Sequence, residues 1–101
     1  LDETVKKQTQ FIQALTADAE ALVFLAKSEE AKSECQKVYE AIRYSDTRSG
    51  DALGSIESQI TIAFNKLKEA VSADQIDAIQ ETANEVLVFV KSRNQKCKIL
   101  K

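Results

Sequence analysis

The side chains of this chain that could do chemistry are carboxylates, amines, guanidiniums and two thiols, and none of them falls in a catalytic pattern. The 101 residues include no histidine, so the usual general base, the usual zinc and iron ligand, and the Ser-His and Cys-His nucleophile pairs are missing. The Glu-x-x-His motif of carboxylate-bridged di-iron bundles is missing for the same reason. Gly50 and Gly54 are not followed by the lysine of a phosphate-binding loop. We therefore expect no enzymatic activity, no metal and no cofactor.

A polar stretch in the middle of the chain combines residue types that are typical of binding sites. Arg43, Tyr44, Asp46 and Arg48 fall within six residues, and tyrosine and arginine are among the residues most enriched at binding hot spots. We expect these four residues to form a candidate interaction loop. The alternative is an ordinary connecting loop, in which Tyr44 closes the end of the core and Asp46 caps backbone amides.

The last part of the chain is basic. Five cations and no acid lie in residues 86–101, which leaves a net charge of −7 for residues 1–85; the cations are Lys91, Arg93, Lys96, Lys98 and Lys101. Cations near the end of a helix complement its dipole and its free carbonyls. The alternative is a patch for nucleic acid or anionic lipid, but it lacks interleaved aromatic residues, and the acidic remainder would repel phosphate. We expect neither a nucleic acid partner nor a membrane segment, since no apolar run approaches the ~18 residues that span a bilayer.

The composition predicts one helical domain. About one hundred residues suit a single core, and with no proline and only two glycines little interrupts helix formation. The chain starts at Leu1 and has no methionine, so we expect it to be a piece of a longer protein. Glycosylation sequons are absent, which is compatible with a bacterial or cytosolic origin, and we expect a cytoplasmic location.

Two helices are predicted in the first half of the chain. Apolar residues recur at spacings of three and four over 2–27 and again over 29–44, which is typical of amphipathic helices. The second apolar set lies roughly half a turn around the same helical wheel, so one straight helix cannot bury both sets against one core. We predict a turn with Ser28 as the N-cap of the second helix. The alternative is one long helix over 2–44.

Two further helices follow the polar loop. The third is predicted over 51–71, with Ser49 or Asp51 as its N-cap, and its apolar spacing is the clearest in the chain. Ser72 and Gln75 have the spacing of a capping box, which predicts a tight turn and a fourth helix over 74–98. The run Val86-Leu87-Val88-Phe89-Val90 has high β propensity, but no second strand is available to pair with it, so helix is favoured there.

The two cysteines are expected to stay reduced. In a bundle of four antiparallel helices, Cys35 lies near the start of the second helix and Cys97 far along the fourth, which runs parallel to the second. With a rise of ~1.5 Å per residue, their α-carbons lie well beyond the ~7 Å limit for a disulfide. Cys35 is expected in the core. Cys97 stands between Lys96 and Lys98, whose charges would favour a reactive thiolate.

Several large apolar residues fall outside the expected core faces, namely Phe24, Ile62 and Phe89. They indicate either broad helix faces that contact two neighbours, with scattered exposed residues, or a surface for a partner. The partner would be another protein or a second copy of the chain.

Together these patterns predict an all-α fold, a single antiparallel four-helix up-down bundle, with a three-helix bundle as the alternative if residues 2–44 form one helix. The expected function is a non-enzymatic protein-interaction or structural module that can self-associate. The alternative is an extracytoplasmic four-helix sensor domain with a small-ligand pocket between helices. The sequence favours the first, because a sensor for an anion would place a basic residue on a core face, and none interrupts the expected apolar faces.

Overall fold

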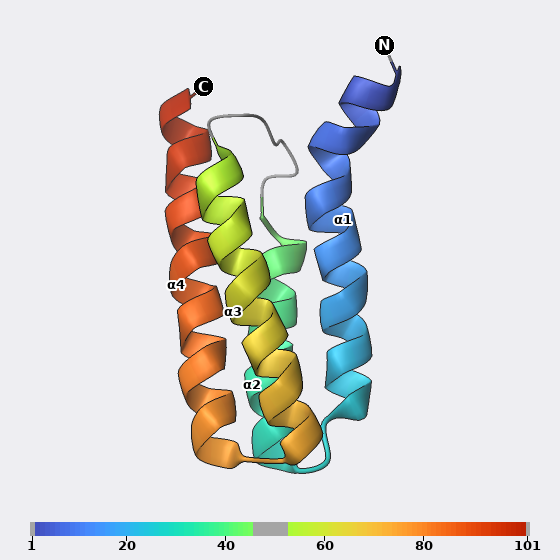
Figure 1. The fold of residues 1–101 in the computed structure, drawn as a ribbon, viewed down its shortest axis with the longest axis vertical. Helices are drawn as coiled ribbons and strands as arrows, with labels where there is room; N and C mark the ends of the chain where they lie inside the picture. Colours follow the sequence, from blue (N-terminus) through green and yellow to red (C-terminus); the bar gives the residue numbers. More distant parts are fainter. Residues whose placement is uncertain (1, 46–52, 101) are drawn as a thin grey trace.

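Four α-helices form an antiparallel bundle in the computed structural model, which describes residues 2–45 and 53–100, with side chains for 11–45 and 53–99 (Figure 1). They are α1 (Asp2–Leu25), α2 (Glu29–Arg43), α3 (Gly54–Ala73) and α4 (Ile76–Leu100). Each boundary lies within three residues of the predicted one. The all-α four-helix bundle is confirmed, and the break between α1 and α2 rules out the three-helix alternative.

The helices pack as two hairpins. α1 packs against α2 and α3 packs against α4, and the two hairpins meet chiefly through α2 and α4. The contact between α1 and α3 is much slighter. One long side of α1 is therefore not covered by another helix of the bundle (Figure 1).

The turn between α1 and α2 forms as predicted. Ser28 is the N-cap of α2, and its Oγ accepts a hydrogen bond of 3.2 Å from the backbone N–H of Ala31. Glu29 and Glu30 occupy the first turn of α2, where negative charge interacts favourably with the helix dipole. A side-chain cap thus starts α2 at a turn that contains neither glycine nor proline.

The turn between α3 and α4 forms differently from the prediction. Ser72 lies inside α3 and is not an N-cap, because α3 continues to Ala73 and ends with Asp74 in the left-handed conformation, at φ 54°. The N–H of Asp74 donates to the carbonyl of Val71 and the N–H of Gln75 to that of Ala70. This is the Schellman arrangement, which satisfies the last carbonyls of a helix. The predicted capping box of Ser72 and Gln75 is therefore wrong.

The start of α3 has no side-chain cap, since Leu53 occupies the N-cap position without such a hydrogen bond. The predicted caps, Ser49 and Asp51, lie outside the described residues, as does the polar loop beyond Ser45. Gly54 opens the helix at an exposed position.

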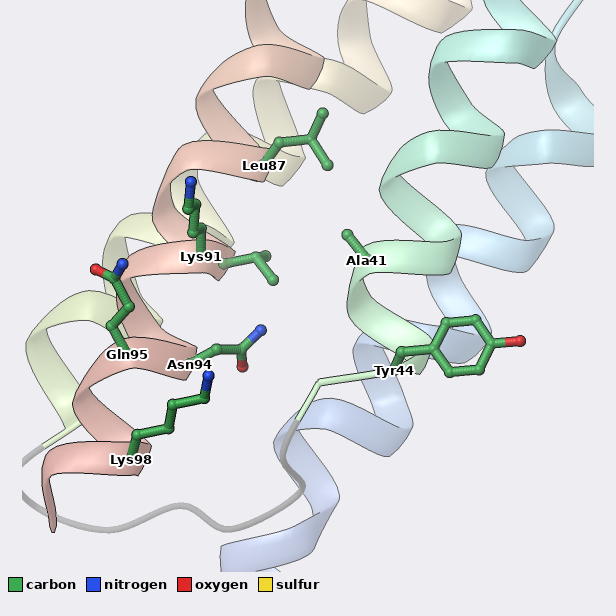
Figure 2. Close-up of a pocket in the computed structure, with 8 residues that line it drawn as sticks. Ala41, Tyr44, Leu87, Lys91, Asn94, Gln95 and Lys98 are labelled. Atoms are coloured by element: carbon green, nitrogen blue, oxygen red, sulfur yellow. The ribbon is translucent and has the colours of Figure 1, made fainter. Parts of the chain in front are cut away.

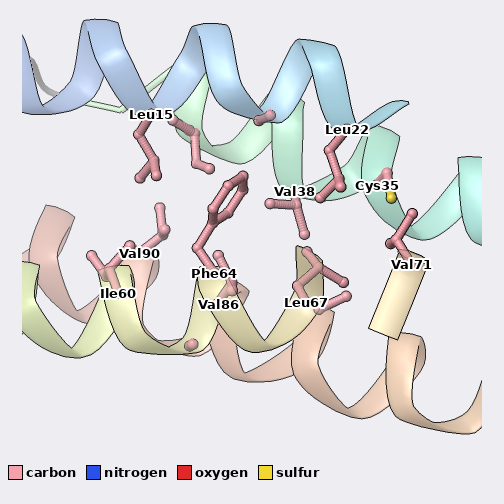
Figure 3. Packing of buried hydrophobic residues seen from close by; sticks show 14 of the residues in the cluster. Leu15, Leu22, Cys35, Val38, Ile60, Phe64, Leu67, Val71, Val86 and Val90 are labelled. Carbon is pink, nitrogen blue, oxygen red and sulfur yellow. The ribbon is translucent and has the colours of Figure 1, made fainter. Parts of the chain in front are cut away.

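Side chains from all four helices form one hydrophobic core. Figure 3 shows the Phe64 ring among side chains of α1, α2 and α4, and the cluster includes Leu15, Leu22, Val38, Leu67, Val86 and Val90. Around α4, Val86 and Val90 are buried, Leu87 and Phe89 are half-buried and Val88 is exposed. The run of β-prone residues is therefore helical and is contacted on several sides, as predicted. No helix in the described part of the chain is long and apolar enough to cross a membrane.

Candidate interaction site

A second apolar face lies on α1, away from the core. We define the outer face of α1 as the exposed residues Ala14, Ala17, Ala21, Phe24 and Leu25. Four of them recur at spacings of three and four, so they share one side of the helix, roughly 150° from the side that carries the core residues. Phe24 is 79% exposed and Leu25 67%. An amphipathic helix usually has one apolar side, and one was predicted for α1. In the structure α1 has two.

The outer face of α1 exposes more apolar area than scattered single residues would. With ~200 Å² for a whole phenylalanine, the exposure of Phe24 corresponds to about 150 Å², and the five residues together expose on the order of 400 Å². That value matches the largest patch of a typical monomer, which is often functional. Within residues 11–25 the charged side chains are Asp18 and Glu20, both acidic and exposed. The outer face is thus an apolar strip beside negative charge.

An apolar groove lies between α3 and α4. It has a volume of about 310 Å³ and is lined by Gln59, Ile62, Ala63, Lys66, Glu85 and Phe89. Ile62 is 57% exposed, whereas Phe89 is half-buried and packs against the core. Two of the three predicted partner-facing residues, Ile62 and Phe89, thus lie together, and Phe24 lies on a different surface.

The candidate interaction loop is described only at its start. Tyr44 is 78% exposed, so it does not close the end of the core. The guanidinium of Arg43 lies 5.9 Å from the ring centroid of Tyr39 and 5.6 Å from that of Tyr44. Arg43 is therefore already engaged within α2. Asp46 and Arg48 lie outside the described residues.

The basic patch near the end of the chain is not as predicted, because Arg93 is buried. Its Nε lies 2.9 Å from Oε2 of Glu57, and its guanidinium lies 5.7 Å from the centroid of the Phe11 ring. The spacing explains this position, since residue 93 continues the series Val86, Val90 and Cys97 along the core side of α4. A basic residue does therefore interrupt an apolar face, contrary to the sequence-based expectation.

The other predicted patch residues do not gather on one side of α4. Lys91, Lys96 and Lys98 are exposed, but only Lys91 and Lys98 line the cavity between α2 and α4. Lys101 lies outside the described residues. Of the predicted basic patch, only Lys91 and Lys98 therefore border the same cavity. They are seven residues apart, about two helical turns.

The two cysteines are free and buried. Burial, with a smaller contribution from the charge of Glu34, raises the pKa of the Cys35 thiol from 9.0 to about 11. Cys35 is thus a core residue, as predicted. Cys97 is 6% exposed, which shields it from reagents and argues against a reactive thiol.

Comparison with known proteins gives no relative: no protein-family model matches the chain, and no curated protein and no solved structure is significantly similar to it. The described residues contain no group of three or more side chains that could hold a metal ion. Function is therefore inferred from the surface and the cavities of the described residues.

Proposed function

We propose that this protein is a non-enzymatic interaction module that docks a helix of another protein on the outer face of α1. The observation that carries the proposal is the second apolar side of α1, with Phe24 and Leu25 largely exposed beside three alanines. Alanines let the backbone of a partner helix approach closely, while a large residue beside them inserts between the partner's side chains. Apolar residues at spacings of three and four are the anchors by which one helix recognises another protein.

The charge of the outer face favours a different protein over a second copy. Any partner on this face would bury on the order of 800 Å² in total, below the ~1,200 Å² of standard stable interfaces, so the interface belongs to the weak or transient class. When two copies of α1 are paired antiparallel with Phe24 over Ala14, the same edges of the two faces adjoin. Asp18 then lies near Asp18 of the second copy and Glu20 near its Glu20, and like charges repel. The partner helix is therefore expected to carry lysine or arginine beside its apolar residues.

Site-specific photo-crosslinking tests this function. A photoreactive phenylalanine analogue replaces Ala17, in the middle of the outer face, and the protein is irradiated in the cells that produce it. We expect one discrete adduct, and mass spectrometry shows whether the adduct contains another protein or a second copy. The control is the same analogue at Val88, an exposed apolar residue of α4. Equal adducts at both positions, or none at position 17, would contradict the proposal.

A further inference from the structure

A cavity of about 350 Å³ lies between α2 and α4, and it is separate from the outer face of α1 (Figure 2). α2 contributes Ala41, its C-cap residue is Tyr44, and α4 contributes Leu87, Val90, Lys91, Asn94, Gln95 and Lys98. In Figure 2 the Tyr44 ring points away from α4. The volume lies at the lower end of the range of ligand pockets, which are typically apolar with a few convergent polar groups.

The charge of the cavity is positive. Lys91 and Lys98 both line it, and none of its eight lining residues is a carboxylate. Neither lysine has an ion-pair partner among the described residues. Two amines over apolar walls formed by Ala41, Leu87 and Val90 would attract an anion with a small aliphatic group.

Asn94 adds a hydrogen-bond acceptor. Ser45 Oγ donates its hydrogen to the carbonyl of Ala41 at 2.6 Å, so it can only accept from Asn94, whose Nδ2 lies 3.2 Å away. This fixes the orientation of the amide, with Nδ2 toward Ser45. Asn94 Oδ1 is then buried with no hydrogen-bond partner. Buried acceptors without a donor are uncommon and costly, and Figure 2 shows Asn94 projecting from α4 toward α2.

We propose that the α2–α4 cavity binds a small aliphatic hydroxy acid. In Figure 2 the Lys91 amine extends toward Leu87 and the Lys98 amine toward Asn94, so these two exposed side chains would turn toward each other to bind one carboxylate. The aliphatic group would contact Leu87 and Val90, and the hydroxyl would donate to Asn94 Oδ1. Asn94 Oδ1 is buried, so the exposed side chain of Lys98, one turn further along α4, would shift to admit the hydroxyl. An amino acid fits less well, because its ammonium group would be repelled by both lysines.

The proposal does not depend on the docking function of α1, and it agrees with the alternative of a small-ligand sensor. A ligand-binding cavity between helices is what a small-ligand sensor bundle requires. Failure of the docking proposal would leave the cavity proposal unchanged, and the reverse also holds, because the two surfaces share no residue.

Three related ligands test the proposal by amide NMR titration of the whole chain: 2-hydroxy-4-methylpentanoate, 4-methylpentanoate, which lacks the hydroxyl, and leucine, which has an ammonium in its place. We expect shifts centred on Ala41, Leu87 and Asn94, with the hydroxy acid binding about 2- to 10-fold more tightly than 4-methylpentanoate, the range for one hydrogen bond. Leucine should bind more weakly than the hydroxy acid. Equal affinity for the hydroxy acid and 4-methylpentanoate would overturn the role of Asn94. No shifts up to ~10 mM ligand would overturn the site.

Charge-matched variants separate the site from general attraction of anions. The double substitution Lys91→Gln with Lys98→Gln should weaken binding of the hydroxy acid at least ~10-fold, because it removes both amines from the cavity. The control, Lys66→Gln with Lys68→Gln on α3, makes the same change in net charge away from the cavity. Equal weakening in both variants would show adventitious anion binding only and overturn the proposal.

Discussion

Replacing Arg93 by methionine tests how the helices are held together near the chain termini. Arg93 is 0% exposed and links α4 to Glu57 of α3 at 2.9 Å, with the Phe11 ring of α1 on its guanidinium. Methionine keeps an unbranched side chain that fills irregular space, so Arg93→Met removes the charge and leaves most of the packing. The substitution therefore isolates the ion pair from the cavity that a smaller residue would create.

The expected loss of stability follows from the Glu57 carboxylate, which remains when Arg93 is replaced. The Glu57 side chain is only 12% exposed, and without Arg93 its carboxylate loses a charge partner that water cannot fully replace. Removing one partner of a buried ion pair typically costs about 3–5 kcal/mol, a large share of the ~5–15 kcal/mol that stabilises a small domain. We expect the free energy of unfolding of Arg93→Met to be lower than wild type by about 3 kcal/mol.

Urea unfolding followed by far-ultraviolet circular dichroism measures this loss. The control is Lys91→Met, which removes an exposed cation two residues away and should change stability by less than about 0.5 kcal/mol. The double substitution Glu57→Leu with Arg93→Met removes both charges of this pair, so it should recover part of the loss. A loss below about 1 kcal/mol in Arg93→Met would refute the reasoning. So would a double variant as unstable as the sum of the two single variants, because it would show that the two charges are not coupled.

Three further predictions concern caps and a thiol. Ser28→Ala should lower the free energy of unfolding by about 1 kcal/mol because it removes the N-cap of α2, and the control Ser33→Ala, inside the helix, should not; urea unfolding of both variants would show an equal effect if the cap were unimportant. Asp74→Gly should raise the midpoint of thermal unfolding by relieving the left-handed conformation, with a gain of about 0.5–1 kcal/mol; an unchanged or lower midpoint would contradict this. The raised pKa of Cys35 keeps its thiol protonated in the fold while the unfolded chain ionises, so its contribution to stability is full below pH 9 and is lost between pH 9 and about 11; Cys35→Ala should flatten that part of a stability–pH profile, and an unchanged slope would count against it.

The sequence predicts the fold well because local signals and packing agree. Apolar spacing defines four helices, and the shift of the apolar side between α1 and α2 locates a turn that no glycine or proline marks. Ser28 supplies the N-cap at that turn. The turn at Asp74 could not be predicted in the same way, because Ser72 matches a capping box equally well. The buried Ala70 and Val71 extend α3 along the core instead, and packing outweighs the local motif.

The candidate sites are harder to predict, because exposure depends on which helices become neighbours. The spacing of Ala14, Ala17, Ala21 and Phe24 is present in the sequence, but alanine is compatible with core and surface alike. The exposure of these residues in the folded bundle shows that this side is uncovered. Arg93 is the opposite case: its spacing on the core side of α4 predicts burial, whereas its charge predicts exposure. Arg93 is buried because its guanidinium pairs with the carboxylate of Glu57, which is distant in sequence and only 12% exposed.

The most direct test of docking on α1 is the effect of Phe24→Ser on the photo-crosslink formed at position 17. Phe24 is 79% exposed, and burying a phenylalanine side chain against a partner helix is worth about 2 kcal/mol, or ~30-fold in affinity. At partner concentrations near the dissociation constant, we predict that the adduct nearly disappears in Phe24→Ser and persists in Val88→Ser, while circular dichroism shows that both variants fold. An adduct at position 17 that forms equally well in Phe24→Ser would contradict the proposal that this face of α1 binds the partner.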